Sequence, residues 1–438
     1  MKRISLKRFR GRRGATPSRS DSPRCAAELA WWALPRAAGC GIAVVSACAL
    51  LAGLLGGCSG PAVSESAGSD VVASSSTSTE EASFEEVAAS FDASALDLEY
   101  SSRDKDASYD EASATRIVLD GASAAVDGDG ASAEESMVTI LTEGTYVVSG
   151  TLDDGQLVVD AADTDKVQVV LAGAAIHNED GPAVYVKQSD KCFVTLADGT
   201  TNTLTDGADY ALEAGSDEPY ATLFSRDDLT INGSGMLAVT SAYRHAICSK
   251  DDLVITGGTY VVDAVEDALR GRDCVKIADG NFTLTAGGDG IKSNNDGDAT
   301  RGFVSIDGGT FAIEAGDDGI QAQTYLCIAG GELDIVAADD ALHSDLEGLL
   351  AGGSLAIEAG DDAFHAETKL VIDDGTVDVT GCYEGYEAEK IYVNGGSTHI
   401  VAADDAVNAS AADLMGDEAD ATTTAAIEAD AAGTAAAS

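Results

Sequence analysis

A repeat of about 22 residues in the second half of the chain constrains the fold more than any other feature. Successive copies of one short signature read AVEDALRG, AGGDGIKS, AGDDGIQA, AADDALHS, AGDDAFHA, GCYEGYEA and AADDAVNA. The second acidic position falls at residues 267, 289, 318, 340, 362, 384 and 405, at intervals of 22, 29, 22, 22, 22 and 21. A fixed period of this length indicates a solenoid, in which each repeat packs on the next.

Short β-strands are expected throughout residues 116–410. Runs such as QLVVDA, KVQVVLAG, CFVTLAD and DLVITGG alternate apolar with polar residues and stop at Gly, Asp or Asn, as strands between tight turns do. Twenty-two residues are too few for a four-stranded propeller blade, but they suit one coil of three short strands. The sequence therefore predicts an all-β fold, a single-stranded parallel β-helix with about 22 residues per coil.

The alternation within each repeat assigns the faces of one sheet. Counted from the second acidic position, position +2 is apolar and position +4 is small, so both should point into the core. Positions +3 and +5 should then point outward, and they are almost entirely polar. This face is the expected ligand-binding surface, with candidate residues Arg270, Arg272, Lys292, Gln321, Gln323, His343, His365 and Glu367.

The acidic pairs at the turn before this face suggest calcium. In-register stacking would place like carboxylates about 5 Å apart, where each pair repels by roughly 1 kcal/mol in water. Ca²⁺, which takes six to eight oxygen ligands, would relieve that repulsion. Asp is also a good turn residue, but turn chemistry explains one Asp per coil more readily than two. The predicted ligands are Asp289, Asp317, Asp318, Asp339, Asp340, Asp361 and Asp362.

Two further motifs bear on metals. The insertion SNNDGDATRG places Asn294, Asp296 and Asp298 around Gly297, as in a short calcium loop, but it has no clear closing Glu. His343 and His365 stand one coil apart and could bind a transition metal. Because no Cys or third His joins them, packing within the ladder or hydrogen bonding to a sugar is the favoured interpretation.

The amino terminus has the pattern of an export signal. Residues 1–36 are basic, residues 37–55 are apolar, and Leu55-Gly56-Gly57-Cys58 resembles a bacterial lipobox. We expect a signal peptide over 1–57, lipidation of Cys58, and a lipid-anchored protein on the extracellular face of the cell membrane; a transmembrane anchor is the alternative. The Ser-, Ala- and Glu-rich stretch 58–95 is an expected disordered tether, and 411–438 an expected disordered tail.

Charge and cysteine content exclude several classes of protein. Beyond Cys58 the chain has 16 basic and 73 acidic residues, a net charge near −57. Such a chain repels nucleic acid and suits cations or partners bridged by cations. The five later cysteines lie at different phases of the repeat, which is not the pattern of a disulfide framework. They are Cys192, Cys248, Cys274, Cys327 and Cys382.

The sequence also resembles a known family, the bacterial carbohydrate-binding β-helix proteins described as binding cellulose and acidic sugars. The resemblance rests on GTYVVSGTLDDGQLVVDA, DKVQVVLAG, LFSRDDLTINGSG, SKDDLVITGGTY, EDALRGRDCVKIADGNFTLTAGGDGIKSNNDGD, AGDDGIQAQTYLCIAGG and CYEGYEAEKIYVNGG, in that order over residues 116–410. It implies a right-handed parallel β-helix similar to that of pectate lyases, with bound calcium and carbohydrate binding but no established catalysis. His245 departs from the family pattern, which has a small polar residue or Gly at that position.

The aromatic content favours one class of sugar. No tryptophan follows Cys58, whereas flat cellulose is usually gripped by aromatic platforms. We therefore expect an acidic polysaccharide such as polygalacturonate, held through Ca²⁺ or through the basic patch of Arg270, Arg272 and Lys292, without cleavage. The alternatives are a calcium-dependent polysaccharide lyase with Lys292 as the base, and a structural or adhesive surface spacer.

Overall fold

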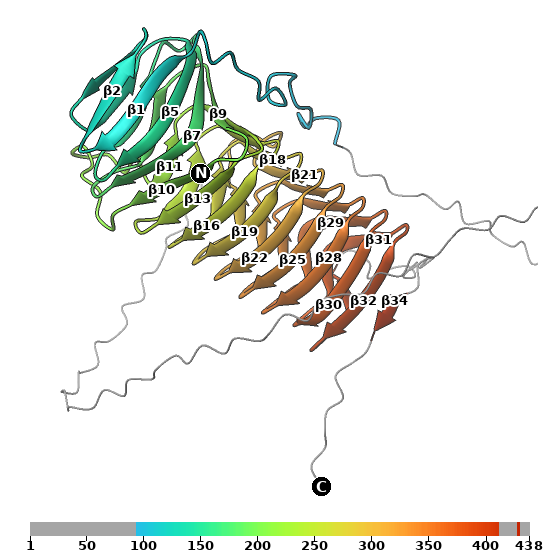
Figure 1. Ribbon diagram of the computed structural model, residues 1–438. Helices are drawn as coiled ribbons and strands as arrows, with labels where there is room; N and C mark the ends of the chain where they lie inside the picture. Colours follow the sequence, from blue (N-terminus) through green and yellow to red (C-terminus); the bar gives the residue numbers. More distant parts are fainter. Residues whose placement is uncertain (1–92, 411–426, 430–438) are drawn as a thin grey trace, which may run out of the picture. The chain divides into compact units, whose positions relative to one another are not determined.

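A parallel β-helix forms the body of the molecule, in a computed structural model that describes residues 93–410 and 427–429 (Figure 1). One coil consists of β17 (Leu269–Gly271), β18 (Cys274–Ile277) and β19 (Asn281–Ala286). The next consists of β20 (Ile291–Ser293), β21 (Phe303–Ile306) and β22 (Thr310–Ala315). Each strand pairs in parallel with its counterpart one coil on. The predicted all-β solenoid is confirmed.

Three parallel sheets run along the rod. The first sheet contains β4 (Met137–Ile140), β6 (Gln156–Asp160), β8 (Val184–Gln188), β11 (Ala221–Ser225), β14 (His245–Ser249), β17, β20, β23 (Ile320–Ala322), β26 (Leu342–Ser344), the starts of β29 (Phe364–Ile372) and β31 (Tyr386–Val393), and β33 (Val407–Ala409). The second contains the starts of β5 (Gly144–Leu152) and β7 (Lys166–Asn178), then β9 (Lys191–Leu196), β12 (Asp228–Gly233), β15 (Asp252–Ile255), β18, β21, β24 (Tyr325–Ile328), β27 (Glu347–Leu350) and the ends of β29 and β31.

The third sheet contains β1 (Thr115–Gly121), the ends of β5 and β7, β10 (Thr201–Asp206), β13 (Met236–Ser241), β16 (Thr259–Ala264), β19, β22, β25 (Glu332–Ala337), β28 (Ser354–Ala359), β30 (Thr376–Cys382), β32 (Ser397–Ala402) and β34 (Ile427–Ala429). At the amino-terminal end, β2 (Ser123–Asp127) pairs antiparallel with β1, and β3 (Ala131–Glu134) with β4. In the part of the chain that the structure describes, no helix is long and apolar enough to cross a membrane.

The core is a stack of identical positions from successive coils. The rings of Tyr260, Phe282 and Phe311 stack at centroid distances of 4.8 and 4.5 Å. Position +2 is buried in every coil from Ile247 to Tyr386, as the alternation predicted. The prediction is wrong at the last coil, where Val407 is 38% exposed, because no further coil in the described residues covers its side of the first sheet.

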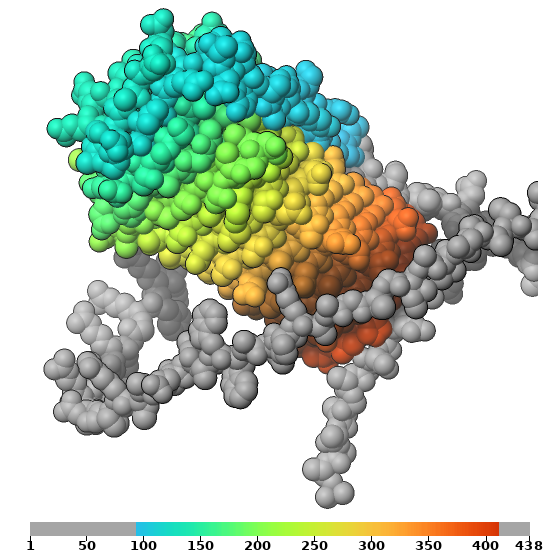
Figure 2. Space-filling view, viewed as in Figure 1, coloured from blue at the N-terminus to red at the C-terminus, as the bar shows by residue number. Residues whose placement is uncertain are grey.

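A segment before the first strand, residues 93–114, runs along the outside of the second sheet and is called the strap below (Figure 2). Asp104 is its central anchor: one oxygen, Oδ1, lies 2.9 Å from Lys191 Nζ and accepts a 2.7 Å hydrogen bond from Thr230. Further along the rod, Leu96 packs with Phe303. The strands beneath it are buried on both faces, in contrast to the alternating burial of β19 and β25.

The strap moves one predicted boundary. Ala93 packs against Leu96 and the coils beneath it, so the last three residues of the tether expected over 58–95 belong to the folded body. The rest of that tether, the signal peptide over 1–57 with Cys58, and the tail over 411–438 apart from β34 lie outside the described residues. The five later cysteines form no disulfide, as predicted, and all five are buried.

Candidate functional site

The +3 positions of the first sheet form one continuous row, as the repeat predicted. Strand register aligns them coil by coil. The row consists of Cys248, Arg270, Lys292, Gln321, His343, His365, Glu387 and Asn408. From Arg270 to Asn408 every member is half-buried. The row therefore presents polar groups at the surface while neighbouring side chains hold them in place.

The second acid of each pair supports the backbone of the neighbouring coil, a role that the sequence did not reveal. Asp267, Asp289, Asp318, Asp340 and Asp362 are all buried and form a row called the aspartate ladder below. In the first four of them the Oδ1 atom accepts the backbone N–H of the next ladder aspartate, at 3.2, 3.0, 3.1 and 2.8 Å in turn. The turn backbone needs that acceptor because a buried, unpaired N–H is costly. One oxygen of each of these carboxylates thus stabilises the turn backbone of the next coil.

The other ladder oxygen, Oδ2, usually meets a cation three residues later. Arg270 donates to Asp267 at 2.6 Å, and Lys292 donates to Asp289. Arg272, in the +5 row, lies 3.1 Å from the carboxylate of Asp273. Each residue of the basic patch expected on this face is therefore paired with a neighbouring carboxylate. Within the described part of the chain, Asp289 belongs to no group of three acidic, His or Cys side chains that could hold a metal ion.

Asp318 lacks such a cation. Its coil carries Gln321 at the +3 position, and the Gln321 side-chain oxygen is buried without a hydrogen-bond partner. Burial, with the neighbouring charges of Asp289 and Asp340, raises the pKa of Asp318 to about 7 although His343 acts in the opposite direction. At Asp362, burial and then Glu387 likewise raise the pKa. At these two ladder positions the surrounding groups supply too little positive charge to keep the carboxyl group ionised as readily as in water.

The first acids of the pairs complete two oxygen-rich groups. Asp317, Asp339 and Asp361 are exposed. One carboxylate oxygen from each of Asp317, Asp318 and Asp339 lies within 4.8 Å of the others, and the same holds for Asp339, Asp340 and Asp361. The predicted acidic ladder is thus brought together across consecutive coils, with one exposed and one buried member in each pair.

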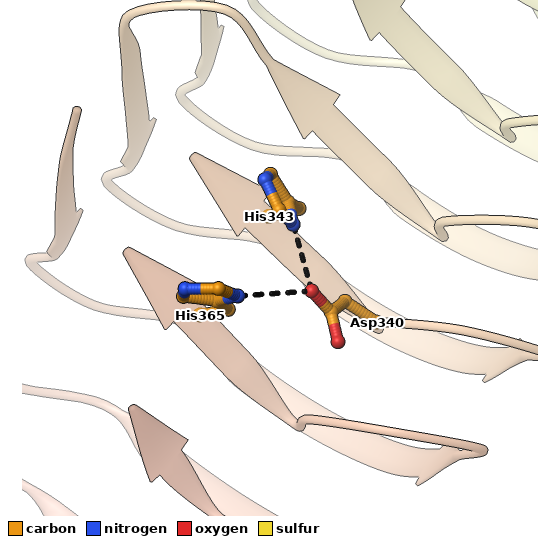
Figure 3. Close-up of side chains that lie close together, drawn as sticks. All are labelled: Asp340, His343 and His365. Atoms are coloured by element: carbon orange, nitrogen blue, oxygen red, sulfur yellow. Dashed lines mark hydrogen bonds and ion pairs between the residues drawn. The ribbon is translucent and has the colours of Figure 1, made fainter. Parts of the chain in front are cut away.

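His343 and His365 converge on a single carboxylate (Figure 3). Their Nδ1 atoms lie 2.7 and 3.4 Å from Oδ2 of Asp340. Burial would lower the pKa of His343, but hydrogen bonds to Asp340 and Asp345 outweigh it and raise the pKa to about 10. Burial alone would raise the pKa of Asp340, but hydrogen bonds from the two imidazoles outweigh this effect and lower the pKa to about 2. In the absence of metal both partners are therefore charged at neutral pH.

The remaining predicted residues lie beside these groups. Gln323 donates to Asp345, and Glu367 is exposed. In the insertion, Asp298 accepts the Thr300 N–H at 2.9 Å, so its carboxylate is used within its own turn. Asn294 is half-buried and Asp296 exposed. Among the described residues, neither aspartate of this loop belongs to a group of three acidic, His or Cys side chains.

Sequence reasoning missed a cavity of about 550 Å³ near the amino-terminal end of the first sheet. Its lining includes Tyr185, which continues the +3 row, together with Tyr210, Lys187, Arg226 and Glu218. The Tyr210 ring stacks on Tyr243 at 4.2 Å. Two tyrosines beside charged groups are suited to a sugar ring. The available signal was the interruption of the strand pattern between residues 207 and 220, which form this side of the cavity.

The chain is similar to carbohydrate-binding domain-containing proteins. A family model described as carbohydrate-binding domain-containing protein matches residues 134–385 and 348–430. A protein of that description from Acetivibrio thermocellus is 39% identical over 151 residues, which are 34% of this chain and 53% of that protein. The chain thus matches about half the length of that relative. A structure of the polysaccharide lyase-like protein from C. thermocellum, a gadolinium derivative, shares 30% identity over 65% of this chain and 99% of its own, with a TM-score of 0.47.

Proposed function

Because the chain belongs to the family of carbohydrate-binding domain-containing proteins, we propose that its first sheet binds an acidic polysaccharide through calcium ions. The binding surface is the +3 row and the exposed acids beside it. In this proposal the protein is a lipoprotein anchored through Cys58 at the cell surface. It holds a polymer of the polygalacturonate type without cutting it.

The observation that supports calcium is the group of Asp317, Asp318 and Asp339. Three carboxylates meet there, one of them buried without a basic partner three residues on, and the unpartnered oxygen of Gln321 belongs to the same coil. Hard oxygen donors of this kind fit Ca²⁺. The second group, Asp339, Asp340 and Asp361, is a weaker candidate because His343 already holds Asp340.

The ion pairs of the basic residues explain why a calcium ion would be needed to hold an anionic sugar. Arg270 and Lys292 are engaged by ladder carboxylates, so little free positive charge remains on this face for a uronate. A calcium ion held by two or three protein carboxylates keeps coordination positions for water or ligand. A sugar carboxylate can fill them, and the chemistry that the ion supplies is this bridge between two anions.

The geometry gives no support to cleavage. Uronate elimination needs a base with a lone pair directed at the substrate, whereas the Lys292 side chain is directed at Asp289. We therefore propose binding alone. The neighbouring cavity of Tyr185 and Tyr210 would receive a sugar ring at the end of the same face.

The test is a pull-down with insoluble polygalacturonate, compared with a neutral polysaccharide, in calcium and in chelator. We expect retention in calcium only, and its loss in the double variant Asp317→Asn/Asp339→Asn. The matched control Asp263→Asn/Asp334→Asn removes two exposed charges from the third sheet and should bind normally. Binding that persists in chelator and in the Asp317→Asn/Asp339→Asn protein would disprove the calcium bridge.

A further inference from the structure

The cluster of His343, His365 and Asp340 differs in kind from the rest of the aspartate ladder. The Asp289 carboxylate meets one cation, Lys292 of its own coil, and the Asp267 carboxylate meets Arg270 and a single imidazole, that of His245. His365 instead lies closer to Asp340 of the preceding coil, at 3.4 Å, than to Asp362 of its own, at 3.8 Å. Two imidazole nitrogens and one carboxylate oxygen are therefore directed at one point (Figure 3).

We propose that this cluster is a binding site for a divalent transition ion such as Zn²⁺, with His343 Nδ1, His365 Nδ1 and Asp340 Oδ2 as ligands. Imidazole nitrogen suits Zn²⁺ and its neighbours in the first transition row, whereas Ca²⁺ prefers oxygen. The site is therefore chemically distinct from the oxygen-only group of Asp317, Asp318 and Asp339, whose first two members lie in the preceding coil. It does not depend on the proposed sugar binding.

The distances fit such an ion. Ligands about 2.0–2.1 Å from a tetrahedral Zn²⁺ lie about 3.3 Å apart. The separation of His365 Nδ1 from Asp340 Oδ2, 3.4 Å, is already close to this value. The 2.7 Å separation of His343 from Asp340 is a hydrogen bond, which would open slightly as the shared proton leaves. Asp362 Oδ2, 3.8 Å from His365 Nδ1, stands in position to serve as a fourth ligand.

The outer contacts resemble those that orient metal ligands. His343 Nε2 lies 3.0 Å from Asp345 Oδ1, and Gln323 donates to the other oxygen of Asp345. A ligating histidine typically donates its second ring N–H to a carboxylate, which fixes the tautomer and directs the other nitrogen at the metal. Asp340 is oriented in the same way, because its Oδ1 accepts the Asp362 N–H at 2.8 Å.

The surroundings also favour a cation. Besides Asp340, the carboxylates of Asp318, Asp345 and Asp362 act on the two histidines, and Glu387 forms a further close group with Asp362 and His365. Five carboxyl groups thus surround two imidazoles. A divalent ion would add positive charge at the place where the ligand atoms already converge.

The experiment is a calorimetric titration of the metal-free full chain with Zn²⁺ in excess Ca²⁺, which fills oxygen-only sites. We expect one Zn²⁺ site, weakened at least about tenfold in His343→Gln, His365→Gln and Asp340→Asn. Asn at 340 retains the oxygen that supports the Asp362 backbone. The control is His399→Gln, since His399 pairs with one carboxylate, Asp378, at 2.9 Å, and should leave affinity unchanged.

A second readout identifies the ligands directly. Co²⁺ bound in place of Zn²⁺ should show visible absorption bands of a nitrogen-containing site, and these bands should disappear in His365→Gln. Circular dichroism of each variant establishes that the solenoid remains folded. Absence of Zn²⁺ binding, displacement of Zn²⁺ by Ca²⁺, or equal affinity in the wild type and both first-sheet histidine variants would overturn the proposal.

Discussion

Replacing Asp318 by Asn should stabilise the protein at neutral and higher pH. Asp318 is 5% exposed, and its pKa is raised from 3.8 to about 7. Asparagine removes the charge but keeps a side-chain oxygen that can accept the Asp340 N–H, a 3.1 Å bond in the wild type. Its amide also supplies an N–H donor in the coil where the Gln321 oxygen has no partner.

The size of the effect follows from the shift. Between pH 4 and 7 the folded wild type binds a proton at Asp318 that the unfolded chain has lost, so its stability falls as the pH rises. A shift of about 3 units corresponds to about 4 kcal/mol, at 1.36 kcal/mol per unit. This is an upper bound, and we expect Asp318→Asn to gain about 2–4 kcal/mol at pH 8 and almost nothing at pH 4.

The assay is urea unfolding followed by circular dichroism, from pH 4 to pH 8, in chelator. Asp267→Asn is the matched control, because burial of Asp267 is outweighed by a hydrogen bond to His245 and by Arg270, which lower its pKa. It should lose stability at pH 8 instead. A gain for Asp318→Asn that is the same at every pH, or a loss at pH 8, would refute the reasoning. Added calcium should shrink the gain if the proposed ion neutralises Asp318.

Three further outcomes test other parts of the structure. Gly290→Ala should lower the melting temperature, since an added Cβ would lie 2.5 Å from both a carbonyl oxygen and an isoleucine methyl; Gly381→Ala, with nothing within 4 Å, should not. Asp104→Ala should destabilise the strap by about 3–5 kcal/mol, because it leaves Lys191 unpaired and largely buried, and limited proteolysis should then cut within 93–114. In metal-free buffer, His343→Gln should lower the free energy of unfolding most below pH 6.5 and progressively less towards pH 10, as measured by urea unfolding. The reason is that the raised pKa of His343 shows that the protonated imidazole stabilises the fold, and this form is lost as the pH approaches 10.

The repeat made the fold and the rows of the first sheet predictable. When identical positions recur every 22 residues, parallel register places them side by side, so the +2, +3 and +4 rows could be assigned from the period alone. Burial followed the same rule until the last coil. The pairing of exposed acids across coils was predictable for the same reason.

Which aspartate of each acidic pair is buried and which is exposed was not predictable. Two adjacent aspartates are equivalent in the sequence, and only the turn geometry decides that Asp318 supports the backbone while Asp317 faces solvent. The same geometry places Arg270 and Lys292 in ion pairs with the aspartate ladder. The partners of the strap were hidden for a different reason: residues 93–114 have no repeat, and their contacts reach up to 179 residues along the chain.

The strap also alters how the rod can come apart. In a plain solenoid each coil touches only its neighbours, so the ends can fray independently of the middle. Here Asp104 joins the coils of Lys191, Thr230 and Thr256, while Lys276 holds the backbone at Asp97 and Glu99. During synthesis this segment leaves the ribosome before all the coils that it contacts. It can therefore dock only after those coils have stacked, and its docking completes the folding of the rod.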